Sequence, residues 1–351
     1  MSDGKHVHEE VRHRLEHSAE DRLDYIEGDQ WVPYGQAEEG LELLRKTVTI
    51  RDQLSPRGVI LLAESQMGKS AIIEAFRLEN PASDNTSGEH IKVPVLVLQF
   101  PDSGGEGVYG EICRTLNVSL SSRPTALELR SEALGVMEDS GVQVLVIDEL
   151  ANVLTGHATT KQRNMNQIKF IMNERRRPVV LGVTPEAYAF IKADKQIRFR
   201  FKKHQLHMLR HDELSLFVKG WIYIQPLRKP SDVGRNFLQE VHERTGGHVG
   251  TIVLLLRELA RKAIETGAEC INEDVLKLVE FIDDSEVAMK KVRRRAPAKS
   301  GAPKKSASGS KGKPASKKAS PKKSAEKIPD EPNDGDNPLG DENPQPAPNS
   351  D

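Results

Sequence analysis

Four short apolar runs, separated by helix-like segments, constrain the fold of this chain more than any other feature. The runs cover residues 58–63, 93–100, 142–147 and 179–183, and each is almost continuously apolar. Continuous apolar character is typical of strands that are buried on both faces of a parallel sheet. A weaker fifth strand is expected near residues 205–209.

Helical patterns fill the intervals between these runs, at residues 69–78, 108–116, 125–138, 162–175 and 185–192. Strands that alternate with helices predict a doubly wound α/β domain. Another helical pattern precedes the first strand, at residues 38–53. After Leu209 the pattern is helical only, at residues 212–224, 233–245, 251–266 and 272–281. We therefore expect an α/β core that carries a small helical lid.

Charge divides the chain into three regions. The net charge is −8 over residues 1–289, +14 over residues 290–327 and −7 over residues 328–351. The Lys-rich stretch contains Ala, Ser, Pro and Gly but no large apolar side chain, so it cannot bury enough surface to fold. We predict a leader (1–57), a core (58–210), a lid (211–289), a disordered Lys-rich tail (290–327) and a disordered acidic end (328–351).

The Lys-rich tail predicts sequence-independent affinity for DNA phosphates, with a solubilising linker as the alternative. The acidic end would compete for the Lys run if it folds back. Within the core, a second basic stretch on one predicted helix is a candidate DNA path or an exposed helix face. Its residues are Lys161, Arg163, Lys169 and Arg175 to Arg177.

Several classes of protein are excluded by composition. No apolar run approaches the roughly 18–20 residues of a membrane span, and the polar N-terminus lacks the apolar stretch of a secretory signal. Two cysteines, Cys113 and Cys270, are too few for a disulfide framework or a thiolate zinc site. We expect a cytoplasmic, nucleoid-associated protein with no membrane partner. Four histidines near the N-terminus lack the acids or cysteines that would complete a metal site: His6, His8, His13 and His17.

The first apolar run leads directly into a sequence typical of a phosphate-binding loop. AESQMGKS, from Ala63 to Ser70, matches the G-x-x-x-x-G-K-[ST] (Walker A) pattern with Ala63 in place of the first Gly. Lys69 would contact the β- and γ-phosphates of ATP, and Ser70 would ligate Mg²⁺. The predicted nucleotide-binding residues are Glu64, Ser65, Gln66, Met67, Gly68, Lys69 and Ser70. A strand–turn–helix that contains GKS by chance is the alternative.

A second apolar run ends in two adjacent acids, which is typical of a Walker B segment. Asp148 and Glu149 follow VLVI, at the strand end where ligands of α/β proteins bind. Asp148 is predicted to hold Mg²⁺, and Glu149 to orient or deprotonate the attacking water. Thr184 follows the run at 179–183 and is a candidate for contacting the γ-phosphate or that water. Alone, the two acids would also suit a helix start, and Thr184 would suit a helix N-cap.

The motifs together resemble the TniB/TnsC family of AAA+ ATP-binding transposition proteins. The resemblance covers roughly residues 15–285 and includes a leader with an Arg and the pair Trp31 and Tyr34. It continues through ESQMGKS, IDELANVLTG, VVLGVTPEAY, ADKQIRFRF and TGGHVGTIVLLL. It implies an AAA+ P-loop ATPase that oligomerises on double-stranded DNA as a ring or helical filament. Such a protein selects a target site and activates a DDE transposase, with a TniQ-type adaptor as a further partner.

The resemblance also implies that an arginine from a neighbouring subunit reaches the γ-phosphate. Arg200 is the candidate by its place in the motif, and Arg198 is the alternative. The other possibility is that either arginine is an exposed charge without a role. Ala151 stands where the family has His. Arg257 lies too far along its helix for the second sensor arginine of many AAA+ proteins. Trp31 and Tyr34 are candidates for packing near the adenine or for simple core aromatics.

A different function remains open from the motifs alone. An AAA+ ATPase of replication initiation or helicase loading would share the nucleotide motifs, although such proteins usually add a helix-turn-helix domain after the lid.

Overall fold

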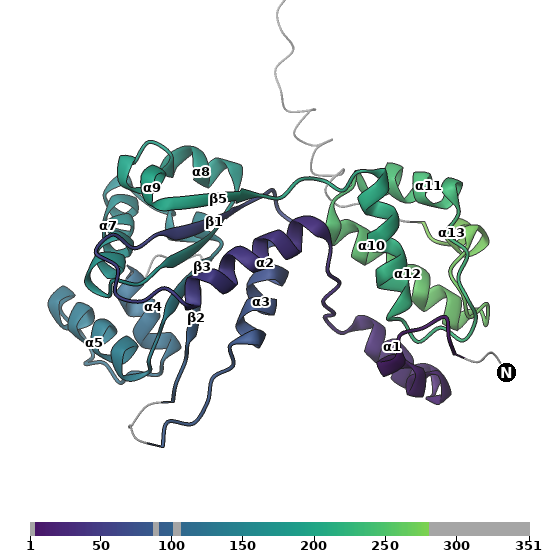
Figure 1. Cartoon of the computed structure of the whole chain (residues 1–351), viewed down its shortest axis with the longest axis horizontal. Helices are drawn as coiled ribbons and strands as arrows, with labels where there is room; N and C mark the ends of the chain where they lie inside the picture. The colour runs from purple at the N-terminus through teal and green to yellow at the C-terminus, as the bar shows by residue number, and fades with distance from the viewer. Residues whose placement is uncertain (1–3, 87–90, 101–106, 281–351) are drawn as a thin grey trace, which may run out of the picture. The chain divides into compact units, whose positions relative to one another are not determined.

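The computed structural model describes residues 4–86, 91–100 and 107–280 (Figure 1). Its α/β part is built on one five-stranded parallel sheet with the strand order β2-β3-β4-β1-β5. The strands are β1 (Gly58–Leu62), β2 (Val95–Gln99), β3 (Val144–Asp148), β4 (Val179–Val183) and β5 (Phe201–Gln205). The expected α/β fold class is confirmed, and the four apolar runs are the four inner or buried strands.

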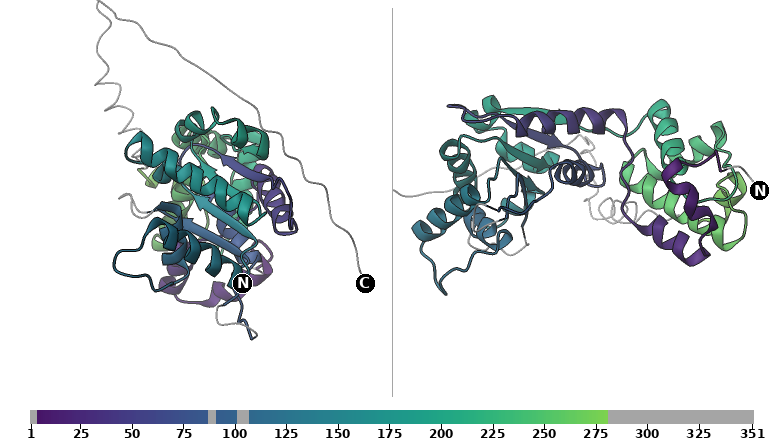
Figure 2. Two further views of the ribbon diagram at one scale, coloured as in Figure 1. Left: turned by 90° about the vertical axis from the view of Figure 1, so that its left-hand side faces the viewer. Right: turned by 60° about the horizontal axis from the view of Figure 1, so that its bottom comes forward.

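Helices cover both faces of this sheet (Figures 1 and 2). One face packs against α2 (Gly35–Val48) and α3 (Lys69–Glu79). The other face packs against α4 (Gly107–Thr115), α5 (Ala126–Asp139), α6 (Leu150–Val153), α7 (Ala158–Glu174), α8 (Pro185–Ile191) and α9 (Lys195–Arg200). Successive strand residues point to opposite faces, so Val59 and Leu61 enter one core while Ile60 and Leu62 enter the other. This is why the strands read as continuously apolar.

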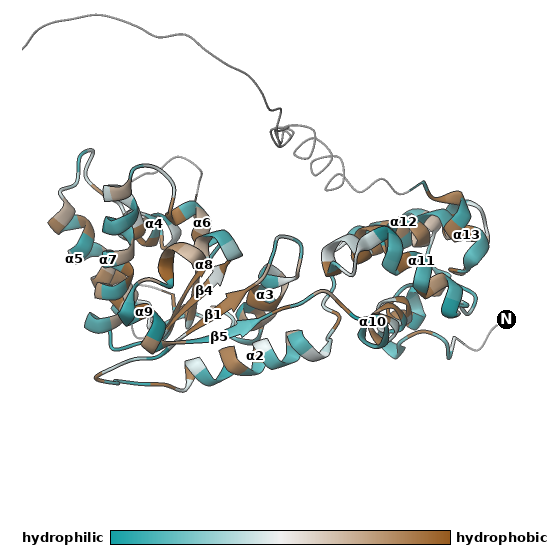
Figure 3. Cartoon of the chain, turned by 90° about the horizontal axis from the view of Figure 1, so that it is seen from above, coloured by the Kyte–Doolittle hydropathy of each residue, from teal (hydrophilic) through white to brown (hydrophobic). Residues whose placement is uncertain are grey.

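The fifth strand is the strand that the apolar pattern misplaces, and the helix expected at residues 38–53 is α2, which ends at Val48. It was expected near residues 205–209, whereas β5 comprises Phe201–Gln205. Its sequence, FKKHQ, is polar because none of its five residues is buried, whereas β2, at the other edge of the sheet, is largely buried and apolar. Lysines on an exposed edge strand are a common protection against pairing with other chains. Figure 3 shows the contrast, with β5 teal and β1 and β4 brown.

The helical part after Leu209 has a core of its own. It consists of α10 (His211–Tyr223), α11 (Arg235–Thr245), α12 (Val249–Glu265) and α13 (Glu273–Leu278). Trp221, Phe237 and Leu255 are among its fully or almost fully buried side chains. The helices after Leu209 therefore pack around an apolar cluster that is separate from those on the two faces of the sheet.

Most of the N-terminal leader belongs to the lid rather than to the sheet. It contains the 3-10 helix η1 (Glu9–Glu16) and α1 (Ala19–Glu27), and the sequence pattern had indicated neither. Ile26 and Val32 are buried in the apolar cluster of the lid. The leader thus contributes to two cores, because α2, later in the same segment, packs on the sheet.

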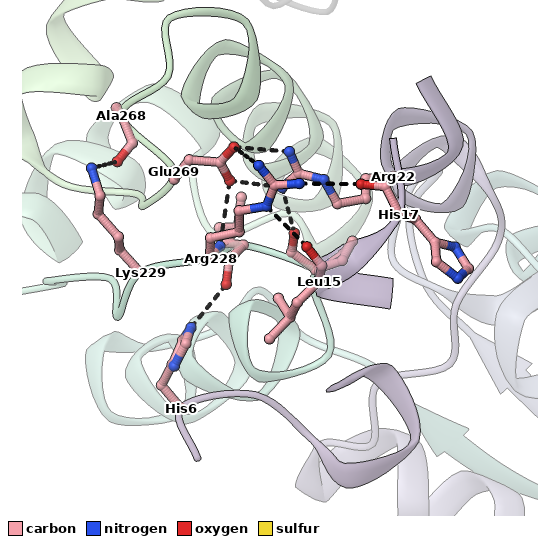
Figure 4. A network of polar contacts seen from close by, with 10 residues as sticks. His6, Leu15, His17, Arg22, Arg228, Lys229, Ala268 and Glu269 are labelled. Carbon is pink, nitrogen blue, oxygen red and sulfur yellow. Dashed lines mark hydrogen bonds and ion pairs between the residues drawn. The ribbon is translucent and has the colours of Figure 1, made fainter. Parts of the chain in front are cut away.

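A buried ion pair fastens α1 to the lid (Figure 4). Arg22, 1% exposed, donates two hydrogen bonds to the carboxylate of Glu269, at 2.7 and 2.8 Å, and a third to the carbonyl of Pro226. Arg228 also contacts Glu269, and it donates to the carbonyl oxygens of Leu15 and His17 (Figure 4). Arg22 is the leader arginine of the family resemblance, and its role here is structural.

Two predicted regions lie outside the described residues. These are the Lys-rich tail (290–327) and the acidic end (328–351). Within the described residues, no helix is long and apolar enough to cross a membrane.

Candidate functional site

The loop between β1 and α3 contains the residues of the predicted phosphate-binding loop. Gly68 precedes the first residue of α3 and has φ +83°, a left-handed conformation that glycine adopts without strain. Gln66 is also left-handed, with φ +61°. Ala63 replaces the usual glycine and is buried; its N–H donates to Val183 O at 3.1 Å, as a continuation of β1. Ala63 is not among the described residues with positive φ, so a side chain is tolerated there.

Lys69 is held inside this loop. Its ammonium group donates to the carbonyl oxygens of Ala63 and Glu64, at 2.8 and 2.7 Å, and the residue is 7% exposed. Burial lowers the pKa of Lys69, while the carboxylates of Asp148 and Glu149 act in the opposite direction. The side chain is therefore a positioned cation at the mouth of the loop, with two acids close enough to influence it.

Asp148 ends β3 at the same edge of the sheet as the loop. The residue is 5% exposed, and its Oδ1 accepts a hydrogen bond from the N–H of Glu149 at 2.9 Å. It lies against Gly182 of β4, where an added Cβ would come within 2.7 Å of Asp148 Oδ1. Gly182 belongs to the VVLGVTPEAY motif, but the sequence alone gives it no role. The structure shows that a residue without a side chain makes room for the buried carboxylate.

Glu149 and Thr184 lie at the same edge but have different environments. Glu149 is exposed and has φ +52°, which is uncommon for a residue with a side chain, and its Oε2 accepts from Asn152 at 3.2 Å. Thr184 follows β4, and its Oγ1 accepts from the N–H of Ala187 at 3.4 Å as the N-cap of α8. Because β4 lies between β3 and β1, Thr184 stands between the loop and the acids. The N-cap role of Thr184 is observed, and a role toward a nucleotide stays a prediction.

The lid contacts the β1–α3 loop through the start of α12. The N–H of Gly250 donates to Gln66 O at 2.7 Å, and Thr251 Oγ1 donates to Gln66 Oε1 at 2.9 Å. A Cβ on Gly250 would lie only 2.9 Å from Gln66. Gly247, three residues earlier, also leaves no room for a side chain, since a Cβ there would lie 2.7 Å from Leu209 O. These contacts explain the T-x-G-x-x-G segment of the lid, for which the sequence alone offers no physical cause.

Tyr34 touches the other side of the loop. Its hydroxyl donates to Met67 O at 3.3 Å and lies 3.3 Å from the position of a Cβ on Gly68. Its ring packs edge-on against Phe217 of α10, with the ring centroids 5.6 Å apart. Burial raises the pKa of the Tyr34 hydroxyl, so it remains a neutral donor. Trp31 packs against the apolar cluster of the α2–α3 face. Tyr34 is thus a loop contact, whereas any contact of either ring with adenine stays a prediction.

Arg200 lies at the end of the sheet where the strands begin, whereas the loop lies at the end where the strands finish. It ends α9, and the next residue, Phe201, is in register with Gly58, the first residue of β1. Leu62 ends β1 four residues later, about 13 Å away at the usual rise of a strand. The Arg200 guanidinium donates to Asn173 Oδ1, and Arg198 lies over the ring of Phe199. Neither arginine joins the site of its own chain.

The site offers ligands that fit Mg²⁺. Asp148 supplies a buried carboxylate, and Ser70, in the first turn of α3, supplies an exposed hydroxyl. Mg²⁺ binds such oxygen ligands together with water and substrate phosphates. Among the described residues, no group of three or more His, Cys, Asp or Glu side chains could hold a metal ion.

The basic stretch of α7 and its C-terminal turn is largely engaged in contacts within the chain. Lys169 pairs with Asp194 at 2.9 Å, and Arg175 pairs with Glu138 at 2.9 Å. Arg176 pairs with Asp52. Arg177 donates only to the carbonyl of Ile50, and Lys161 and Arg163 form no ion pair within the described residues, so a DNA path along this stretch stays a prediction. Arg257, the distant sensor candidate, instead contacts the carbonyl of Gly28 and the carboxylate of Asp29.

The fold and the loop define the class of protein. The chain is similar to the ORC2 protein of Aeropyrum pernix, with TM-score 0.51 and 12% identity over 76% of this chain and 74% of that one. It is similar to a Walker-type ATPase of Pyrococcus abyssi, with TM-score 0.50 and 16% identity over 76% and 77%. Cdc6p of Pyrobaculum aerophilum has TM-score 0.51 and 15% identity over 75% and 73%. The chain therefore has the fold of AAA+ P-loop ATPases.

The family follows from the sequence itself. The model of the bacterial TniB protein family matches residues 22–211, more than half of the chain. The chain belongs to the TniB family, as the motifs had indicated. No match was found among curated proteins.

Proposed function

We propose that this protein is an ATP-dependent, DNA-binding regulator of transposition. The observation that carries the proposal is the convergence of a phosphate loop, Lys69, Asp148 and Thr184 at one edge of a parallel sheet, in a member of the TniB family. The site is built for a nucleoside triphosphate, because a loop of backbone N–H groups and a positioned lysine complement phosphate charge.

Each residue has a distinct role in the proposed hydrolysis. Residues 64–70 hold the phosphates of ATP, with Lys69 against the β- and γ-phosphates. Ser70 and Asp148 hold Mg²⁺, which neutralises the charge that develops on the phosphates. Glu149 orients the attacking water and accepts its proton, as an exposed carboxylate beside a buried one can do. Thr184 donates to the γ-phosphate or holds the same water.

Arg200 completes the site from a neighbouring copy of the chain. Its position at the far edge of its own sheet supports this role, since it cannot reach the loop that its own chain provides. A regulatory ATPase of this kind hydrolyses ATP slowly and assembles as a ring or helical filament on double-stranded DNA. The assembly selects the target, activates a DDE transposase and meets a TniQ-type adaptor.

Electron microscopy of the full chain with double-stranded DNA and ATP tests the proposal most directly. We expect ordered assemblies with ATP and none without nucleotide. Lys69→Ala is expected to lose both ATP binding and assembly, because the positioned cation is gone. Glu149→Gln is expected to keep ATP binding and to hold the assembled state, because only water activation is lost.

Lys46→Ala is the matched control, since Lys46 is an exposed lysine of α2 that pairs with Glu42. It should leave ATP binding and assembly unchanged. Micromolar ATP affinity in Lys69→Ala would refute the assignment of residues 63–70 as a phosphate-binding loop. Parental hydrolysis in Glu149→Gln would show that another residue activates the water. Transposition assays with the cognate transposase then test the regulatory role.

A further inference from the structure

Most basic side chains of the described lid are engaged with an acceptor. Five arginines and lysines of α11, α12 and α13 form ion pairs: Arg244, Arg257, Arg261, Lys262 and Lys277. Within residues 211–280, Lys219 and Arg235 differ, because neither side chain is in any hydrogen bond or ion pair. Both are exposed. Lys229 also lacks an acidic partner, but its ammonium group donates to the carbonyl oxygen of Ala268, so Lys219 and Arg235 are the lysine and arginine of residues 211–280 whose donors are all free.

These two side chains line the same groove between α10 and α11. The groove has a volume of about 860 Å³ and is lined by His211, Lys219, Val233, Gly234, Arg235, Leu238, Gln239, His242 and Glu243. At one end, the rings of His211 and His242 stack with their centroids 4.5 Å apart. Glu243 is the one acid among the lining residues, and Gln239 already donates to it at 2.9 Å. With both histidines neutral, the lining residues carry a net charge of +1, from Lys219 and Arg235 against Glu243.

We propose that this groove binds phosphate groups of the double-stranded DNA backbone, which rests on the proposed function of the protein. Lys219 and Arg235 donate to phosphate oxygens, and His211 and His242 offer ring N–H donors at the other end. Contacts of this kind hold a protein on DNA without reading its sequence. The lid then contributes DNA affinity that does not depend on the tail.

The dimensions of the groove agree with this ligand. Lys219 follows His211 by eight residues on α10, which separates them by about 12 Å along the helix. One strand of B-DNA carries a phosphate about every 3.4 Å of axis, so a groove of about 12 Å that runs parallel to the duplex axis spans about three to four phosphates. The apolar residues Val233 and Leu238 also line the groove, where they can pack against sugar. A single small anion would leave one end of the groove unmatched.

The test measures DNA affinity of the full chain with ATP as a function of salt concentration. The variant is the double substitution Lys219→Gln with Arg235→Gln, and the control is Lys262→Gln with Lys277→Gln. The control lysines are exposed lid residues that already have acid partners. We expect the slope of log affinity against log salt to flatten by about 1.8 in the variant, or about 0.9 for each phosphate that is no longer neutralised. The control should retain the parental slope.

A footprint of lysine acetylation identifies the ligand. Lys219 is expected to be protected by a 60-base-pair duplex, whereas Lys277 stays reactive. Inorganic phosphate and poly-glutamate are the comparison probes at matched charge concentration.

An unchanged salt slope in the variant overturns the proposal while leaving ATP-dependent DNA binding, and hence the proposed function, in place. Protection by poly-glutamate but not by the duplex overturns it in favour of an acidic protein partner. Protection by inorganic phosphate alone overturns it in favour of a small-anion site. If the parental chain binds no DNA with ATP, both this proposal and the proposed function fail.

Discussion

Gly182→Ala tests whether a missing side chain on β4 positions the proposed metal ligand. The added methyl would lie 2.7 Å from Asp148 Oδ1 and 3.4 Å from the backbone N of Glu149. A Cβ is not found within 3.0 Å of another heavy atom, so the carboxylate has to move by several tenths of an ångström. Gly182 is buried between β3 and β1, which leaves little room for relaxation.

The size of the effect follows from these distances. Overpacking a buried site costs about 1–3 kcal/mol. A domain of this size loses about 2–4 °C in Tm for each kcal/mol, so we expect Tm to fall by about 2–12 °C. Displacement of a catalytic group by about 1 Å reduces rates about 100-fold, so a smaller shift of Asp148 should reduce hydrolysis about tenfold. ATP binding should persist, because Lys69 and the loop are unchanged.

The assay combines thermal unfolding with Mg²⁺-dependent ATP hydrolysis and ATP binding, all below the Tm of the variant. Gly135→Ala is the control, since no atom lies within 4 Å of a Cβ at that exposed position of α5. It should raise stability by up to about 1 kcal/mol, because alanine favours a helix more than glycine does. Parental Tm and parental hydrolysis in Gly182→Ala would refute the link between β4 and the metal ligand.

Three further predictions concern the lid, the leader and the tail. Gly250→Ala should weaken ATP binding about tenfold, measured by titration, because its methyl would lie 2.9 Å from the phosphate loop and cost about 1–3 kcal/mol. Burial raises the pKa of Glu269, but hydrogen bonds and charge from Arg22 outweigh it and hold the pKa below its usual range. The ion pair should therefore stabilise the fold above about pH 4.5, and this stabilisation should be lost as the pH falls through the lower pKa of the folded state. Glu269→Ala should abolish this pH dependence and lower the unfolding free energy at pH 7 by about 3 kcal/mol. Truncation after Met289 should flatten the salt slope of DNA binding by about 0.9 for each phosphate that the tail had neutralised. Truncation after Lys327 should tighten DNA binding if the acidic end competes for the Lys-rich tail. Equal affinities and equal slopes for the full chain and both truncations would leave the tail as a linker.

The contacts around the loop show how its conformation is tied to the rest of the chain. Gln66 accepts hydrogen bonds from Gly250 and Thr251 of the lid, and Met67 accepts one from Tyr34. Tyr34 packs in turn on Phe217 of the lid. A change in the conformation of the loop on nucleotide binding would therefore alter the contacts that it makes with the start of α12 and, through Tyr34, with α10.

The sequence by itself determined the elements whose signal is local. Buried strands must be apolar on both faces, so four of them could be predicted from apolar runs alone. The loop from Ala63 to Ser70 was also readable, because phosphate binding needs a glycine and a lysine at fixed spacing between a strand and a helix. The acids after β3 could be placed at the same edge, since parallel strands end together.

The tertiary structure decided everything that depends on partners far apart in the chain. β5 was misplaced because none of its residues is buried, so it has no apolar signature, whereas the other edge strand, β2, is covered by helices and is apolar. Nothing near Arg22 in sequence indicates its pairing with Glu269, which lies 247 residues away, or that the leader helps to form the core of the lid. The roles of Gly182 and Gly250 are equally non-local, because each is defined by an atom of another segment that a Cβ would strike. A glycine in a sequence states only that a side chain is absent, and the fold supplies the neighbour that requires its absence.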